Sequence, residues 1–428
     1  MKILALATRH ARSKYLATLL VPIAMVLAGC TSVENHANHS TPVHADPRLP
    51  DGDGGLPAFY TWSNAIPAAP GQLLRSESLT PSQSLVNAGR NIRILYSSTN
   101  GVDNHTPVVV SGALYLPKGT PPKDGWPLMA WAHGTVGTAD VCAPSFAGRS
   151  ARDTAYLNYW LSQGYAIVAT DYQGLGTAGL HPYGLTRPLA YDVLDSIRAV
   201  QRGDFSLSSR VLVFGQSQGA RAGFATAVYA KHYAPELDIV GLIATGSPYA
   251  TAKLKTKSTE HGLTSTSVDP TFAYVILRFG TAALLDASFS PGDYLNAKAM
   301  SVFDLSQRAC LPDLEQKVVS EGVTASESFK RPWPKALVDE FTQQAAYPAL
   351  DSSIPIFMGT GGKDVDVYTA DQLKLDEDAC MTGDRIEFHL YPALDHSGAV
   401  NGSLPDSTLF AKRAFLGEHI AGNCTRHP

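Results

Sequence analysis

The sequence predicts an α/β fold in which a doubly wound, mostly parallel sheet carries an inserted, mainly helical cap. Short apolar and β-branched runs, typical of strands buried on both faces, alternate with segments whose apolar residues recur at helical spacing. About 100 residues separate two of these runs, between Pro248 and Ile354, which is far more than a helical crossover needs. We therefore expect one α/β domain at residues 58–428, with a cap inserted at about 249–353.

The elements of this domain are predicted in chain order from their local patterns. Residues 108–119 ("VVVSGALYLPKG") alternate in the manner of an antiparallel strand. Alanine-rich or amphipathic segments without an interior proline predict helices at 187–202 and 220–234. The buried strands are expected within residues 127–137, 164–176, 210–215, 239–248, 354–368 and 385–400.

Residues 1–29 have the pattern of a signal peptide. A basic start is followed by 15 mostly apolar residues, a stretch too short to span a bilayer comfortably. The segment ends in "LAGC", which is similar to the bacterial lipobox, so Cys30 is expected to be lipidated and to become the new N-terminus. Thr31 and Ser32 then favour the outer membrane. We expect an exported protein of a Gram-negative bacterium, anchored through Cys30 or, if cleavage falls elsewhere, secreted.

Residues 30–57 are polar and rich in His, Pro and Gly, which predicts a flexible linker. Removal of residues 1–29 leaves 30 basic residues against 38 acidic ones, a net charge of about −8. An acidic balance without a basic run argues against nucleic acid and anionic membrane surfaces as partners.

Four cysteines remain in the predicted domain: Cys142, Cys310, Cys380 and Cys424. An even number in an exported chain predicts two disulfides, for which three pairings are possible. Their spacing matches no zinc site, and we expect no metal or other cofactor.

The pentapeptide Gly215 to Gly219 ("GQSQG") places Ser217 between two glycines directly after a buried strand and before a helix. This is the pattern of a nucleophile elbow, a strained strand-to-helix turn in which the flanking positions must be tiny because backbone segments nearly touch. A chance match in a glycine-rich loop is the alternative. Since the strand and the helix flank the motif as it requires, we favour Ser217 as a nucleophile.

A serine nucleophile needs a base and an acid that orients the base. Asp364 and Asp366 follow the next-to-last predicted strand, and His396 follows the last. The carboxyl ends of parallel strands meet at one edge of the sheet, so these side chains should converge with Ser217. The chain order Ser, Asp, His is the order of the catalytic triad on an α/β-hydrolase sheet.

With these motifs, the chain resembles an α/β hydrolase of the secretory lipase family. The segment "AHGTVGTADVCAPS" (132–145) is the most family-specific match, and "DYQGLG" (171–176) and "LDHSGAV" (394–400) also follow the family's style. The resemblance covers most of residues 107–424. It implies a carboxylic ester hydrolase, a triacylglycerol lipase or carboxylesterase, that acts through an acyl-enzyme intermediate.

The resemblance also implies roles for the triad residues. His396 would be the general base, and Asp364 rather than Asp366 would be the acid, because its position after the glycines matches the family pattern. His133 in the His-Gly turn would shape the neighbouring loop instead of acting as a base. Asp395 is interpreted as a turn residue.

Two backbone N–H groups are expected to form the oxyanion hole, those of Gln218 and Thr135. The Asp140 side chain is an alternative participant. In the insertion, the apolar residues 270–285 would form a cap helix that either faces an acyl pocket or packs onto the core.

By resemblance to the family's fungal lipases, the disulfides are expected to join Cys142 to Cys310 and Cys380 to Cys424. The first would tie the oxyanion segment to the cap, and the second would brace the region after the catalytic acid against the C-terminus.

Other functions on the same scaffold are an esterase acting on esterified cell-wall polymers, a serine peptidase or acyltransferase, and a surface lipoprotein that only binds. The retention of both Ser217 and His396 argues against the binding-only alternative. The expected partner is a small-molecule or lipid ester.

Overall fold

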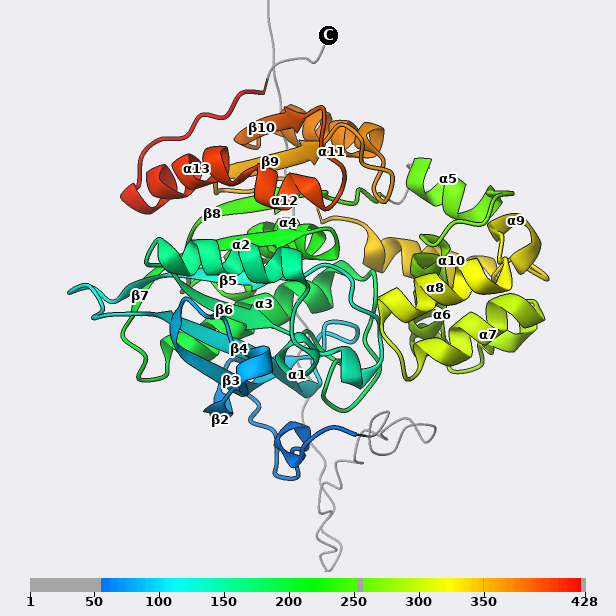
Figure 1. The fold of residues 1–428 in the computed structure, drawn as a ribbon, viewed down its shortest axis with the longest axis horizontal. Coiled ribbons are helices and arrows are strands. Elements are labelled where there is room, and N and C mark those ends of the chain that lie inside the picture. Colours follow the sequence, from blue (N-terminus) through cyan, green and yellow to red (C-terminus); the bar gives the residue numbers. More distant parts are fainter. Residues whose placement is uncertain (1–54, 252–256, 349, 425–428) are drawn as a thin grey trace, which may run out of the picture. The chain divides into compact units, whose positions relative to one another are not determined.

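The computed structural model describes residues 55–251, 257–348 and 350–424 (Figure 1). The predicted signal peptide, the lipidation site Cys30 and nearly all of the predicted linker lie outside the described residues. No helix in the described part of the chain is long and apolar enough to cross a membrane.

One mixed sheet of nine strands forms the centre of the domain. Its strand order is β10-β9-β8-β7-β5-β6-β4-β3-β2. The neighbouring strands β10, β9, β8, β7, β5 and β6 pair in parallel. The pairs β4 with β6, β3 with β4 and β2 with β3 are antiparallel. The strands are β2 (Leu73–Ser78), β3 (Ala88–Thr99), β4 (Pro107–Pro117), β5 (Trp126–Ala132), β6 (Ala166–Thr170), β7 (Leu207–Gln216), β8 (Asp238–Thr245), β9 (Ile356–Gly361) and β10 (Ile386–Tyr391).

Helices cover both faces of this sheet, as a doubly wound fold requires. One apolar layer packs α3, α4 and α11 against the sheet, and a second layer packs α2, α12 and α13 against the other face. The helices outside the insertion are α1 (Pro144–Ala147), α2 (Ala151–Ser162), α3 (Thr186–Gln201), α4 (Gln218–Tyr233), α11 (Thr369–Met381), α12 (Gly398–Gly402) and α13 (Leu404–Leu416). The central strands read as continuous apolar runs because both of their faces are buried; every residue of β6 is buried.

The insertion between β8 and β9 is mainly helical in its described residues, and Figure 1 shows these helices grouped beside the sheet. They are α5 (Lys257–Thr264), α6 (Phe272–Leu285), α7 (Ala297–Ser306), α8 (Leu311–Glu321), α9 (Ala325–Ser328) and α10 (Lys335–Ala345). Their apolar faces form a cluster that includes Phe279, Leu314 and Leu337 and, from outside the insertion, Tyr183. We call this segment the cap.

The four cysteines form two disulfides, Cys142–Cys310 and Cys380–Cys424. These are the two pairs that the family resemblance implied. Cys142 ends the short 3-10 helix η3 (Asp140–Cys142), and Cys310 directly precedes α8 of the cap. Beside this disulfide, the amide of Leu311 donates to the carbonyl of Val136 at 2.9 Å. The loop after β5 is therefore attached to the cap both covalently and by a backbone hydrogen bond.

Candidate active site

Ser217 lies in a sharp turn between β7 and α4, at the carboxyl edge of the sheet. Its backbone has φ 57° and ψ −119°, a strained conformation for a residue with a side chain. Glycine is required on both sides, because a Cβ on Gly215 would overlap the backbone of Gly219, and a Cβ on Gly219 would overlap the carbonyl of Ala132. The amide of Ser217 donates to the carbonyl of Thr245 at 2.9 Å, which ties the turn to the end of β8.

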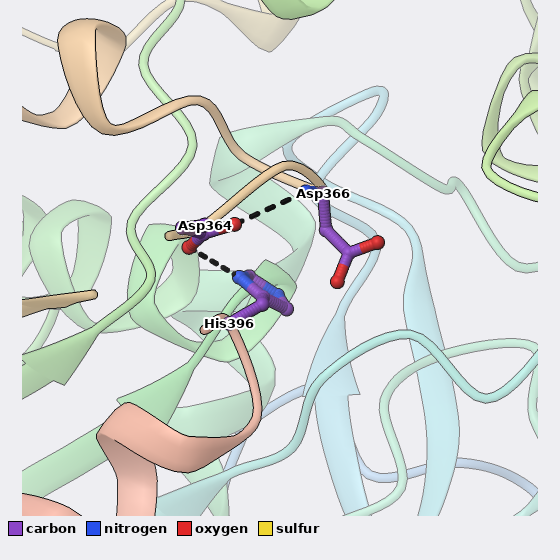
Figure 2. A group of neighbouring side chains, drawn as sticks. All are labelled: Asp364, Asp366 and His396. Carbon is purple, nitrogen blue, oxygen red and sulfur yellow. Dashed lines mark hydrogen bonds and ion pairs between the residues drawn. The ribbon is translucent and has the colours of Figure 1, made fainter. Parts of the chain in front are cut away.

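His396 and Asp364 are brought together from two loops that are far apart in sequence (Figure 2). The loop after β9 carries Asp364, and the loop after β10 carries His396; both side chains are buried. The imidazole Nδ1 donates to Asp364 Oδ2 at 2.7 Å. A base whose Nδ1 is held by a buried carboxylate has its Nε2 available to take a proton.

The Asp364 carboxylate is held in turn by further hydrogen bonds. Its Oδ1 accepts from the amides of Asp366 at 3.1 Å and Val367 at 2.9 Å. Its Oδ2 accepts from Gln372 Nε2 at 2.8 Å, and Thr360 fixes the other end of that amide by donating to Gln372 Oε1 at 3.0 Å. Gln372 lies on α11, and nothing in its local sequence distinguishes it from a surface glutamine.

Gly246 connects the elbow to the Asp364–His396 pair. It directly follows Thr245, whose carbonyl accepts the hydrogen bond from the Ser217 amide. The φ angle of Gly246 is +61°. A Cβ at this position would lie 2.7 Å from Cε1 of His396 and 3.6 Å from Oδ2 of Asp364. The imidazole therefore rests against the backbone next to the serine turn. Within the described residues, the Ser217 hydroxyl makes no hydrogen bond to His396, and such bonds often tighten only when substrate is bound.

Asp366, the alternative acid, lies beside the same imidazole. Potential ligand atoms of Asp364, Asp366 and His396 all lie within 4.8 Å of one another, a spacing that could hold a cation. However, Nδ1 of His396 and Oδ2 of Asp364 already share a hydrogen bond. Burial raises the pKa of the Asp366 carboxyl, and the nearby imidazole lowers it. Asp366 contacts Asp364 through its backbone amide (Figure 2).

The two residues predicted for the oxyanion hole meet through their side chains. Thr135 Oγ1 donates to Gln218 Oε1 at 3.3 Å and contacts the hydroxyl of Tyr183 at 3.0 Å. Gln218 Nε2 contacts His181 Nε2 at 3.0 Å, and His181 Nδ1 contacts the carbonyl of Gln173 at 2.9 Å. Burial lowers the pKa of His181 to about 4, so the ring is neutral. Its Nδ1–H then donates to the carbonyl, its Nε2 accepts from Gln218, and the orientation of the Gln218 amide is determined.

The remaining polar residues of the sequence motifs lie outside this acid–base pair. His133 is buried, with Nδ1 bonded to the carbonyl of Gly134 at 2.7 Å and Nε2 3.2 Å from the carbonyl of Asp171. Burial lowers the pKa of His133. Asp395 is exposed and accepts from the amide of Gly398 at 2.7 Å, a turn contact. Asp140 is buried at the start of η3.

Comparisons with known proteins identify the family of this chain. A sequence model of the secretory lipase family matches residues 148–418, more than half of the chain. The chain belongs to the secretory lipase family. It is a carboxylic ester hydrolase, and its substrate is an ester. The family and the two disulfides indicate an extracellular protein.

The similarity to individual relatives extends over most of this secretory lipase. It is 25% identical over 398 residues to lipase A of Moesziomyces aphidis, which covers 84% of this chain and 80% of the relative. The crystal structure of Candida antarctica lipase A in its closed state is 25% identical, covers 85% of this chain and 86% of its own, and superposes with a TM-score of 0.66. A rice cell-wall-degrading esterase from Xanthomonas oryzae shares the fold, with 20% identity, 81% and 98% coverage and a TM-score of 0.62.

Proposed function

We propose that this secretory lipase cleaves its ester in two steps through an acyl-enzyme intermediate, with Ser217 as nucleophile, His396 as general base and Asp364 as the residue that orients the base. The observation that carries the proposal is the 2.7 Å hydrogen bond between His396 and Asp364, which lies against Gly246 next to the strained serine turn. Asp366 is not assigned this role, because Nδ1 of His396 already bonds to Asp364.

In the first step, Nε2 of His396 takes the hydroxyl proton of Ser217 as Oγ attacks the ester carbonyl. The carbonyl oxygen becomes negatively charged, and the backbone N–H groups of Gln218 and Thr135 stabilise it. The tetrahedral intermediate then collapses, and the imidazolium returns the proton to the departing alcohol. The acyl group is left on Ser217.

In the second step, water attacks the acyl-enzyme with His396 again as base, and the carboxylic acid leaves. Asp364 stabilises the imidazolium that forms in both steps, and its three hydrogen bonds keep it oriented for this. The network of His181, Gln218 and Thr135 supports the oxyanion loop by fixing the side chains on either side of it.

Replacing the nucleophile tests this proposal. Ser217→Ala should lower kcat on 4-nitrophenyl esters by about 10⁴-fold or more, because the members of a triad act as a unit. Ser162→Ala, the same change at an exposed position on α2, is the control and should retain full activity. A phosphonate ester should add its mass to the Ser217 peptide of the wild type only. Ordinary turnover by a folded Ser217→Ala variant would disprove the assignment.

We further propose that the mature protein begins at Cys30, carries lipid there and belongs to the outer membrane of a Gram-negative bacterium. The support is the lipobox-like sequence before Cys30. An intact mass without added acyl groups, or a mature chain that starts elsewhere, would show instead that the enzyme is freely secreted.

A further inference from the structure

One face of cap helix α6 carries the polar side chains of an otherwise apolar helix. Tyr274, Arg278 and Thr281 are spaced by four and three residues, so they lie along the same side of the helix. Thr281 Oγ1 donates to the carbonyl of Tyr183 at 3.0 Å, and it is fully buried. The hydroxyl of Tyr183 in turn contacts Thr135 in the predicted oxyanion loop. This face of α6 is therefore turned toward the catalytic edge of the sheet.

Arg278 has no anionic partner on this face among the residues that the structure describes. Within the described residues, its guanidinium takes part in no hydrogen bond and no ion pair, and its exposure is intermediate, so it is still reachable. The groups that influence its charge are Tyr183 and a second arginine, Arg221. Arg221 donates to the carbonyls of Gly184 at 3.0 Å and Ala345 at 2.9 Å, and it too is bonded to no carboxylate.

Two buried arginines of the sheet domain, by contrast, are paired with carboxylates. Arg93 pairs with Glu77 at 2.5 Å, and Arg198 pairs with Asp195 at 2.9 Å and Glu236 at 2.6 Å. Partial withdrawal of a cation from water without a counter-charge has a cost, and this burial, together with the neighbouring Arg221, lowers the pKa of Arg278. An anion at this position would offset that cost.

The carboxylates near the active site lie elsewhere and do not supply this counter-charge. Asp366 in the catalytic loop and Glu315 on α8 influence each other, and both lie close to Tyr274, one turn away from Arg278. Burial, and to a lesser degree repulsion from Asp366, raises the pKa of Glu315. The site thus has an acidic side near Tyr274 and a basic side near Tyr183, where Arg278 and Arg221 lie.

We propose that Arg278 forms a subsite for a carboxylate carried by the ester substrate, so that this enzyme accepts esters of dicarboxylic acids or of hydroxy acids as well as neutral esters. A guanidinium presents a planar fork of N–H donors that fits a carboxylate. The inference rests on the proposed function, since it assumes that the ester binds between Ser217 and the polar face of α6.

Matched esters test the subsite on each side of the scissile bond. On the acyl side, mono-4-nitrophenyl glutarate is compared with 4-nitrophenyl pentanoate; on the alcohol side, 4-acetoxybenzoate is compared with its methyl ester. The quantity measured is the ratio of kcat/KM for the anionic ester to that for the neutral one. Spontaneous hydrolysis, which is fast for the glutarate, is subtracted with Ser217→Ala.

Arg278→Gln and Arg278→Met, which remove the charge at similar size, should lower the ratio at least tenfold for one of the two pairs, because a desolvated charge pair is lost. Arg278→Lys, which retains the positive charge, should keep most of this ratio. Arg331→Gln is the matched control: Arg331 is an exposed cap arginine paired with Asp293, and its loss should leave both ratios unchanged. The pair that responds identifies the side of the ester that carries the carboxylate.

Equal ratios in wild type, Arg278→Gln and Arg278→Met would overturn the subsite while leaving the proposed function intact. Turnover of the neutral esters by Ser217→Ala would instead overturn the proposed function. If neither charge-removing variant folds, the wild type decides: glutarate should inhibit pentanoate ester hydrolysis competitively, whereas 1,5-pentanediol should not. Failure of glutarate to inhibit would overturn the proposal.

Discussion

The sheet domain and the cap hold their functional residues in different ways. In the sheet domain, backbone contacts position the chemistry: Ser217 is held by its strained turn and by Thr245, and the imidazole of His396 rests on Gly246. The cap instead packs around its own apolar cluster, and it reaches the sheet domain through separate ties such as the Cys142–Cys310 disulfide and the bond from Thr281 to Tyr183.

This difference links the reaction to the edge of the sheet and the substrate preference to the cap. Residues that must meet the reacting atoms within a few tenths of an ångström lie on loops whose ends are fixed by parallel strands. Arg278, which we propose to face the substrate at a greater distance, lies on helix α6, and this helix packs in the apolar cluster of the cap. Changes in the cap should therefore alter substrate preference and stability, whereas changes at the sheet edge should abolish turnover.

The largest effect is expected from the proposed acid of the triad. Asp364→Asn should lower kcat by about 10⁴-fold, because an amide at this position favours the wrong tautomer of His396. Asp366→Asn should lower kcat less than tenfold, since its carboxylate does not hold Nδ1. Steady-state kinetics on one neutral ester compare the two variants. The reverse ranking would make Asp366 the acid.

The two disulfides should differ in what they protect. By loop-closure entropy, losing the 168-residue loop of Cys142–Cys310 costs about 5 kcal/mol, and losing the 44-residue loop of Cys380–Cys424 about 4 kcal/mol. Replacing each pair by serines and following hydrogen exchange separates local from global effects. Exchange in α8 should rise selectively without Cys142–Cys310, because Cys310 directly precedes that helix. Equal exchange in the two variants would mean that the cap is held by its packing alone.

Alanine substitutions at two glycines, one in the sheet domain and one in the cap, should have the smallest effects. Gly246→Ala should lower kcat/KM by about 100-fold, because its Cβ would displace the imidazole of His396. Gly280→Ala in cap helix α6 meets no atom within 4 Å and should stabilise the protein by up to about 1 kcal/mol through helix propensity. Thermal unfolding and ester kinetics of both variants check this. Full activity of Gly246→Ala would refute the contact that links the elbow to the base.

The local sequence was sufficient to predict several features of the fold, and the same physical reason applies to each. The elbow at Ser217, the helices α3, α4 and α6, and the buried strands from β5 to β10 depend on neighbours in the chain, whose spacing and size can be read directly. The strands β2 and β3 were not predicted. Polar residues interrupt the apolar pattern of both strands in the sequence, and the pairing of β3 with β4 and of β2 with β3 at the antiparallel end of the sheet is a tertiary feature.

The tertiary structure alone decided which side chains meet. Sequence order placed both Asp364 and Asp366 after β9, and only the family pattern favoured Asp364; the structure adds the hydrogen bond between Asp364 and His396. Gln372 and His181 carry no local signal, because their roles depend on contacts with the Asp364 and Gln218 side chains. The same holds for Arg278: the sequence cannot show whether an arginine in an apolar helix is paired, and only the fold shows that no acid among the described residues bonds to it. The sequence by itself determined the elements and the elbow, because these depend on local spacing; the assembled site depends on contacts between distant residues, which only folding brings within reach.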